Sequence, residues 1–171
     1  MSQVATHVAS QVLSLHGERI ILPNTAVAEI IPYSRPEELS GSLKKNAPAW
    51  LLGMHTWRGI SVPVLALEAM FDGSYEQQAS RSSIAVINAA SSVAGVPFFA
   101  IATQGIPRLL QVGADTLSVI EETGDTNKTI ACHVVLDGEV AIIPDLDVIE
   151  SMVSKIFNQT TGSKKKKNKK K

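Results

Sequence analysis

Short runs of Val, Ile and Leu recur along this chain, each ended by Gly, Pro, Asn or Ser at intervals of roughly ten residues. Such runs are typical of β-strands. Their regular spacing predicts a barrel or sandwich rather than a parallel sheet with crossover helices. The pattern predicts ten strands, over residues 11–15, 19–22, 26–31, 51–57, 60–65, 82–87, 97–102, 106–112, 129–136 and 139–143.

Glycine-containing turns separate several of these predicted strands. They read His16-Gly17-Glu18, Arg58-Gly59 and Asp137-Gly138. Two-residue hairpin turns need backbone with positive φ, which glycine adopts at low cost. We therefore expect a β-hairpin at each turn.

Two of the hairpins share a sequence pattern. The stretch from Gly17, GERIILPNTAV, aligns without a gap with the stretch from Gly138, GEVAIIPDLDV. Both begin with Gly-Glu and carry apolar residues at the fifth and sixth positions and proline at the seventh. A repeated hairpin suits two similar small barrels. The alternative is that any buried hairpin shares this pattern.

The C-terminal region has a helical pattern. Apolar residues recur there with the three- and four-residue spacing of one helix face: Ile149, Met152, Val153, Ile156 and Phe157. Asp147 is the expected N-cap, and Glu150 would complete a capping box. Packing on the core is favoured for this face over binding a partner helix. A shorter helical turn is expected over residues 65–71.

The charge is divided between body and tail. Seven of the sixteen basic residues occupy the last eight positions: Lys164, Lys165, Lys166, Lys167, Lys169, Lys170 and Lys171. The body keeps nine basic and sixteen acidic residues, a net charge of minus seven, which disfavours broad phosphate binding. We expect residues 160–171 to form a disordered tail, rooted at Gly162 and Ser163, that makes a weak contact with an anionic membrane. The alternative is a solubilising tail with no partner.

Residues 1–10 are interpreted as an N-terminal extension and residues 11–159 as one domain. The single cysteine, Cys132, excludes an intramolecular disulfide and agrees with a reducing compartment. The N-terminus lacks the pattern of a signal peptide, and no apolar run is long enough to span a membrane. The sequence therefore predicts a cytoplasmic location.

The sequence lacks the common motifs of catalysis. It contains no phosphate-binding glycine loop, no H-E-x-x-H and no G-x-S-x-G. Cys132 and His133 are adjacent in a predicted strand and would point to opposite faces, so they cannot form a nucleophile–base pair. Asp145 and Asp147 stand at a helix start, where capping explains them better than acid–base chemistry. We expect no catalytic residue, no cofactor, no metal site and no small-molecule substrate.

The stretch LGMHTWRGISVPVLAL, residues 52–67, resembles the signature of the CheW-like family. In that family a glycine begins a strand, an Arg-Gly turn follows, and the next strand carries Pro-Val before a leucine. The matching residues here are Gly53, Arg58, Gly59, Pro63, Val64 and Leu67. The family's first hairpin leads to a Glu-Ile pair, matched by Glu29 and Ile30, and its last hairpin and helix start match residues 134–150. The resemblance covers residues 12–152.

This resemblance implies an all-β fold of two intertwined five-stranded SH3-like barrels with a short C-terminal helix. It also implies a non-enzymatic adaptor between the cytoplasmic tip of a methyl-accepting chemoreceptor and the regulatory domain of a CheA-type histidine kinase. Glu29 and Arg58, at charged positions of the family motif, are expected to form the functional pair. The expected partner-binding set is Glu29, Trp57, Arg58 and Gly59, with Lys44 and Lys45 from the loop over residues 34–46. The alternative for the pair is an exposed ion pair with no partner role.

The chain also departs from the family pattern. Ala66 stands where family members usually carry Asp, Thr103 and Gln104 stand in a region that often reads Val-Asp-x-Val, and the glycine-rich turn expected near residues 128–133 is absent. These departures favour an accessory adaptor, such as one of a type IV pilus chemosensory system.

Two alternative functions are an SH3-like barrel that binds nucleic acid through its lysine tail, and an enzyme with a degenerate site. The acidic body and the small number of aromatic residues argue against base stacking.

Overall fold

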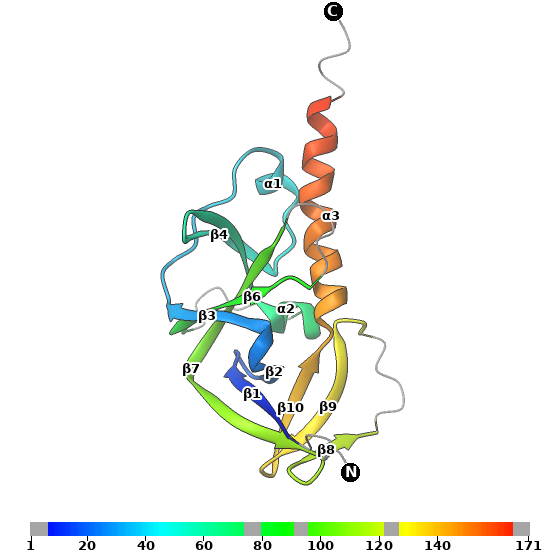
Figure 1. Cartoon of the computed structure of the whole chain (residues 1–171). Coiled ribbons are helices and arrows are strands. Elements are labelled where there is room, and N and C mark those ends of the chain that lie inside the picture. Colours follow the sequence, from blue (N-terminus) through cyan, green and yellow to red (C-terminus); the bar gives the residue numbers. More distant parts are fainter. Residues whose placement is uncertain (1–6, 74–79, 91–95, 122–126, 166–171) are drawn as a thin grey trace, which may run out of the picture.

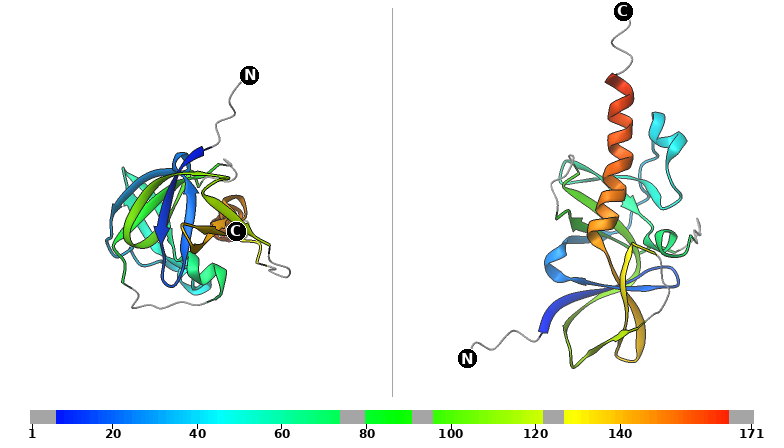
Figure 2. Two further views of the ribbon diagram at one scale, coloured as in Figure 1. Left: turned by 90° about the horizontal axis from the view of Figure 1, so that it is seen from below. Right: turned by 90° about the vertical axis from the view of Figure 1, so that its right-hand side faces the viewer.

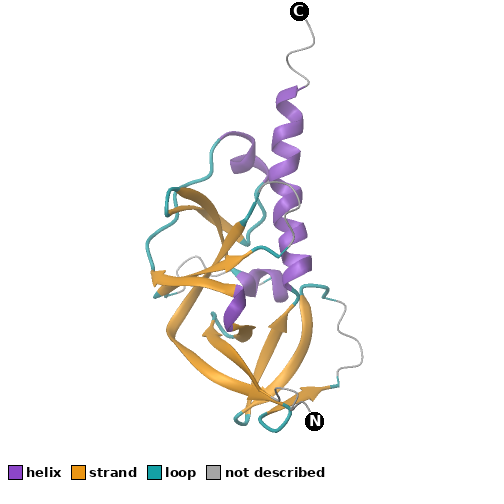
Figure 3. Ribbon diagram, viewed as in Figure 1, coloured by secondary structure: helices purple, strands orange, loops and turns teal. Residues whose placement is uncertain are grey.

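Strands dominate the fold (Figure 3). The structure is a computed structural model that describes residues 7–73, 80–90, 96–121 and 127–165, with side chains up to residue 159. The strands are β1 (His7–Ser14), β2 (Arg19–Pro23), β3 (Val27–Pro32), β4 (Leu51–Trp57), β5 (Ile60–Leu65), β6 (Ser83–Asn88), β7 (Phe98–Gly113), β8 (Leu117–Ile120), β9 (Ile130–Leu136) and β10 (Glu139–Pro144). The helices are the short 3-10 helix η1 (Asn24–Ala26), α1 (Gly41–Asn46), α2 (Leu67–Phe71) and α3 (Leu146–Lys165).

The strands form two groups that share β7. They are ordered β3-β6-β7-β1-β2-β10-β9-β8, with β5 beside β7 and β4 beside β5. The first half of β7 pairs with β6 and β5, whereas its second half pairs with β1. We call β3, β4, β5 and β6 the upper group and β1, β2, β8, β9 and β10 the lower group, after their positions in Figure 1. The mostly-β fold with a C-terminal helix is confirmed; the two closed barrels stay a prediction.

The strand prediction was wrong around β7. The strands predicted over residues 97–102 and 106–112 are one strand of sixteen residues. Gly105, with φ +62°, lies inside this strand, and the register with β1 shifts between Val12 and Ser14. Strand β8 was not predicted, because its four residues lie between a turn and a polar loop.

The hydrophobic core has three clusters. The largest joins the two groups to α2 and α3, and its fully buried side chains include Leu13, Ile20, Leu65, Phe99 and Ile149. A second cluster lies in the upper group around Trp57, Val62 and Val86. A third lies in the lower group around Val12, Ile21 and Val134, where Cys132 is partly buried against it. Cys132 therefore contributes to packing in the lower group.

Helix α3 packs on the core through its predicted apolar face. Ile149 and Val153 are buried, and Met152, Ile156 and Phe157 pack against the largest cluster.

The predicted N-cap of α3 is wrong. Asp145 caps the helix, because its Oδ1 accepts a hydrogen bond from the Val148 amide at 3.1 Å. Asp147 lies inside the first turn with an exposed side chain. Glu150 is buried, and its Oε2 accepts a hydrogen bond from the Ala90 amide at 3.0 Å.

One strand and one helix extend past the predicted domain limits of residues 11 and 159. Strand β1 begins at His7, so residues 7–10 belong to the sheet. Helix α3 runs through Gly162 and Ser163, where a flexible root was predicted, and ends at Lys165. A glycine inside a helix costs only about 1 kcal/mol, which does not have to end it. The tail lysines after Lys165 lie outside the described residues.

Helix α3 extends beyond the strands in two perpendicular views (Figures 1 and 2). Within the described residues, no helix is both long and apolar enough to cross a membrane.

Candidate functional site

Arg58 and Gly59 form the two-residue turn between β4 and β5. Their φ angles are +48° and +77°, so both residues lie in the left-handed region required by a type I′ hairpin. This conformation costs an ordinary L-residue about 1–2 kcal/mol, and Asn, Asp or Gly usually occupies it. A hairpin alone therefore gives no reason for an arginine here, and such an outlier supports a hypothesis of function.

Glu29 lies directly beside this turn. Its Oε2 accepts hydrogen bonds from Trp57 Nε1 at 2.8 Å and Arg58 Nε at 3.2 Å, and it lies 3.1 Å from Arg58 Nη2. Glu29 lies inside β3, as the third residue of the strand. The register between β3 and β6 shifts between Val27 and Glu29, and such an irregularity re-aims a side chain. Four of the six residues predicted to bind a partner therefore lie together in the structure: Glu29, Trp57, Arg58 and Gly59.

Trp57 connects this surface group to the core. Its side chain is buried and contacts the Phe98 ring edge-to-face, with centroids 4.9 Å apart. The Arg58 guanidinium carbon lies 5.0 Å from the centroid of the Trp57 ring. The indole N–H bond to Glu29 was missed in the sequence, because it joins residues from two strands whose arrangement no local pattern reveals.

Gly53 holds the segment before α1 against β4. Glu37 forms an isolated bridge with Met54, and a Cβ on Gly53 would lie 2.4 Å from the Glu37 carbonyl oxygen. Gly53 also has φ +150°, which other residues rarely adopt. This motif glycine is therefore explained by close backbone approach.

Lys44 and Lys45 are not joined to the Glu29–Arg58 pair. They lie in the last turn of α1, a helix where a loop was predicted. Lys44 Nζ lies 3.3 Å from Glu38 Oε2. Among the described residues, no hydrogen bond or ion pair connects either lysine to Glu29 or Arg58. Their part in a binding surface therefore stays a prediction.

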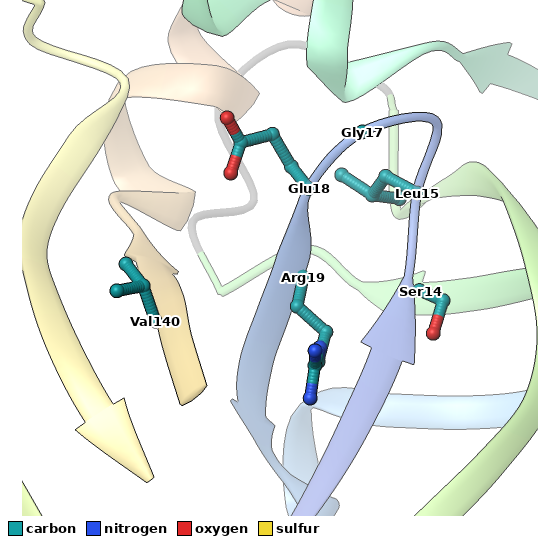
Figure 4. Close-up of a pocket in the computed structure, with 6 residues that line it drawn as sticks. All are labelled: Ser14, Leu15, Gly17, Glu18, Arg19 and Val140. Carbon is teal, nitrogen blue, oxygen red and sulfur yellow. The ribbon is translucent and has the colours of Figure 1, made fainter. Parts of the chain in front are cut away.

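A shallow pocket of about 370 Å³ lies between the β1–β2 hairpin and β10 (Figure 4). It is lined by Ser14, Leu15, Gly17, Glu18, Arg19 and Val140. Strands β2 and β10 pair only at Ile20 and Ile142, and Arg19 forms an ion pair with Glu139 beside the pocket. The two similar hairpins thus lie side by side, and the pocket occupies their junction. None of these six residues belongs to the site predicted from the sequence.

Comparison with known proteins identifies the family. The family model described as CheW-like domain matches residues 11–153, which include the β4–β5 hairpin and Glu29. The chain belongs to the CheW-like family. Among solved structures, the CheW-like chain is similar to the scaffolding protein TtCheW from Thermoanaerobacter tengcongensis, with a TM-score of 0.64 and 14% sequence identity. The match covers 81% of this chain and 89% of TtCheW, and at this identity it shows the fold alone. No curated protein matches the sequence.

Two of the departures from the family pattern lie in the interior of this CheW-like domain. Ala66 and Thr103 are both fully buried, and the Thr103 hydroxyl donates to the Ser83 carbonyl at 3.3 Å. These two differences therefore change packing and not the exposed surface.

Proposed function

We propose that this protein is a non-enzymatic adaptor of a chemosensory pathway. It couples the cytoplasmic tip of a methyl-accepting chemoreceptor to the regulatory domain of a CheA-type histidine kinase, and it works in the cytoplasm, where both of those regions lie. Membership of the CheW-like family supports this proposal, as does the description of TtCheW as a scaffolding protein. The β4–β5 turn supplies the supporting site.

The observation that carries the site is the arginine held in an unfavourable backbone conformation. Arg58 is 68% exposed, and Glu29 clamps one edge of its guanidinium. A guanidinium held in one position loses less side-chain entropy on binding, a saving of about 0.5–1.5 kcal/mol. We propose that Arg58 and Glu29 contact a partner directly, flanked by Trp57 and Gly59. Lys44 and Lys45 belong to the same proposed surface.

The adaptor role is tested by bridging. The purified chain is mixed with the kinase regulatory domain and with a receptor cytoplasmic fragment from the same organism, and complexes are separated by size. We expect a complex that contains all three proteins and that does not form without this chain. Binding to neither partner would contradict the proposal.

The site is tested with Arg58→Ala, Arg58→Lys and Glu29→Ala. We expect Arg58→Ala to weaken binding of the kinase domain about tenfold or more, or 1.4 kcal/mol, with little change in melting temperature. Lysine should not rescue binding, because it lacks the planar fork of N–H donors. If all three variants bind like the wild type, or bind less only because they unfold, the contact surface lies elsewhere, and residues 34–46 become the next candidate.

We also propose that the lysine tail makes a weak contact with an anionic membrane. Each lysine near such a surface contributes up to about 1 kcal/mol, and salt screens this attraction within about 8 Å. Deletion of residues 163–171 should abolish binding to vesicles that contain anionic lipid at low salt, and binding of the full chain should fall at high salt. Equal binding of both chains would leave a solubilising tail. Binding of the full chain to RNA but not to vesicles would instead favour the nucleic-acid alternative.

Finally, we propose an accessory pathway, such as a type IV pilus chemosensory system. The support for this pathway is the departure from the family pattern at Gln104. Of the three departing residues, Ala66 and Thr103 are buried, whereas Gln104 is partly exposed and can alter a binding surface. Deletion of the gene should reduce pilus-driven movement on surfaces and leave swimming chemotaxis intact. Loss of swimming chemotaxis alone would assign the chain to the flagellar pathway.

A further inference from the structure

The two oxygens of the Glu29 carboxylate have different surroundings. All the hydrogen bonds that the described residues make to this carboxylate reach Oε2, at 2.8 Å from Trp57 Nε1 and 3.2 Å from Arg58 Nε, and Nη2 of Arg58 also approaches Oε2. The Glu29 side chain is 38% exposed. Its Oε1 therefore remains an acceptor for a group from outside the described chain.

The Arg58 guanidinium is likewise engaged along one edge only. A guanidinium has five N–H donors in a fixed plane. The edge that carries Nε and Nη2 faces Glu29, so the end that carries Nη1 and the outer hydrogen of Nη2 is left to donate. With 68% of the Arg58 side chain exposed, this end is accessible. The surface thus presents a free donor beside a free acceptor.

This combination determines what kind of group fits. The pair carries no net charge, and a partner carboxylate at the guanidinium end would lie near the negatively charged Oε1 of Glu29. A neutral amide matches both positions, because its N–H donates to Oε1 and its C=O accepts from Arg58. We infer that the Glu29–Arg58 surface recognises a neutral amide of the kinase regulatory domain, either a peptide group or an Asn or Gln side chain. This inference rests on the proposed adaptor function.

Trp57 is the positioning residue of this surface. The residue is 8% exposed, its ring has an edge-to-face contact with Phe98, and the Arg58 guanidinium lies over the face of the ring. Its N–H also directs Oε2 of Glu29 toward the turn. Trp57, which is packed in the buried cluster, therefore holds the side chains of Glu29 and Arg58 in position.

The variant Glu29→Gln distinguishes a partner amide from a partner carboxylate, because it should weaken binding of the first and strengthen binding of the second. In this variant the new side-chain carbonyl accepts from Trp57 and Arg58, and the new NH₂ group replaces the free acceptor. An amide N–H then meets a donor, so binding of the kinase regulatory domain should weaken about fivefold or more. A partner carboxylate would gain a donor and lose a repulsion. Equal or tighter binding by Glu29→Gln overturns the assignment.

Salt dependence gives an independent readout. For a neutral contact, the wild type and Arg58→Ala should lose affinity in parallel as salt rises, because the Arg58 contact is not a charge–charge contact with the partner. A clearly shallower salt dependence in Arg58→Ala would indicate a partner carboxylate. A wild-type chain that binds neither kinase nor receptor overturns the adaptor proposal itself, whereas tighter binding by Glu29→Gln overturns only the amide.

Trp57→Phe tests the positioning role, since Phe keeps the ring and removes the N–H donor. The Arg58 Nε–H signal in NMR should exchange faster with water, and kinase binding should weaken about threefold with unchanged melting. Trp50→Phe is the matched control, because Trp50 packs against the largest core cluster, away from the turn. Unchanged exchange at Arg58 in Trp57→Phe, or an equal change in Trp50→Phe, overturns this role.

Discussion

Two of the Glu–Arg pairs in this CheW-like domain differ sharply in their surroundings. Glu29 and Arg58 lie at the surface, with side chains 38% and 68% exposed. Glu68 of α2 and Arg81 also form an ion pair, but their side chains are only 1% and 5% exposed. Both pairs join a carboxylate to a guanidinium. They differ in solvation, because water reaches the exposed pair and is excluded from the buried one.

Neither member of the buried pair can be removed alone without leaving a buried, unpaired charge. Arg81 also donates to the Ala102 carbonyl at 3.3 Å, which ties the segment before β6 to β7 and α2. Removing one member of such a pair leaves a charge buried without its counterion. Oε2 of Glu68 is buried and accepts no hydrogen bond from the described residues, so this carboxylate already depends on a single partner.

The exposed pair adds little to stability. Surface ion pairs are worth about 0–1 kcal/mol, because water solvates both charges when they separate. Arg58 nevertheless occupies a left-handed backbone position that costs about as much as the pair returns. Arg58 therefore adds no net stability to the fold. The comparison teaches that the exposed Glu29–Arg58 pair is a better candidate for partner binding than the buried Glu68–Arg81 pair.

The largest expected effect comes from breaking the buried pair. Arg81→Ala should lower the free energy of unfolding by about 3–5 kcal/mol, because Glu68 is left as an uncompensated buried charge. Denaturation in urea measures this loss. The double variant Glu68→Leu/Arg81→Met is the control, and it should recover most of the stability because neither charge remains. A loss below about 1 kcal/mol in Arg81→Ala would show that water reaches the pair.

The second prediction compares the two type I′ turns. Asp137 and Gly138 have φ +51° and +76°, nearly the same as Arg58 and Gly59. Asp137→Arg should cost about 1 kcal/mol of unfolding free energy, because arginine tolerates this conformation less well than aspartate. Arg58→Asn should change stability by less than about 1 kcal/mol, since asparagine suits the turn and only an exposed pair is lost. Thermal melting of both variants tests this. A large loss in Arg58→Asn would give Arg58 a structural role.

A third prediction concerns the two aspartates at the start of α3. We expect the position of each carboxylate, and not its charge alone, to determine how much it stabilises the fold. Asp145→Ala should cost about 1 kcal/mol, because the Val148 amide loses its hydrogen-bond acceptor. Asp147→Ala is the matched control, two residues along and exposed, and it should cost less than about 0.5 kcal/mol. Equal losses measured by urea denaturation would contradict the assignment of Asp145 as the cap.

The smallest effect is expected for the exposed pair of His7 and Asp115. His7 Nε2 lies 2.8 Å from Asp115 Oδ1, and this hydrogen bond lowers the pKa of Asp115 below its ordinary value of 3.8. Because the folded-state pKa is the lower one, the contribution to stability is present above about pH 4 and is lost as the pH falls through the folded-state pKa. Carboxyl NMR should give a midpoint below 3.8 in the wild type and a higher midpoint in His7→Asn, where the backbone hydrogen bonds to Asp115 remain. An unchanged midpoint in His7→Asn would mean that the backbone contacts of Asp115 cause the shift.

Much of the strand pattern was predictable because glycine turns and apolar runs are local signals. The hairpins at Gly59 and Gly138 form as predicted, with positive φ at both turn residues. The continuity of β7 was not predictable, because Gly105 and Pro107 are usual signs of a strand end, yet the partner strand changes there while the chain continues. The cap of α3 was missed because two aspartates fit the helix start and only the contact of Asp145 with the Val148 amide distinguishes them.

The candidate site was predictable only in part. The family resemblance brings Glu29 and Arg58 together, and the structure has them in contact. The Trp57–Glu29 hydrogen bond and the Phe98 contact depend on how β3, β4 and β7 are arranged, which no short stretch of sequence encodes. The buried pair of Glu68 and Arg81 was missed for the same reason, because charged residues are mostly exposed and nothing local marks these two as buried.

The most direct test of the account is the binding of Arg58→Asn to the kinase regulatory domain, with unfolding measured on the same preparation. Arg19→Asn is the matched control, since Arg19 also belongs to an ion pair, with Glu139, but lies in the lower group. The account predicts at least about a tenfold loss of affinity for Arg58→Asn with an unfolding midpoint close to the wild type, and wild-type affinity for Arg19→Asn. Wild-type affinity in Arg58→Asn, or an equal loss in both variants, would contradict it.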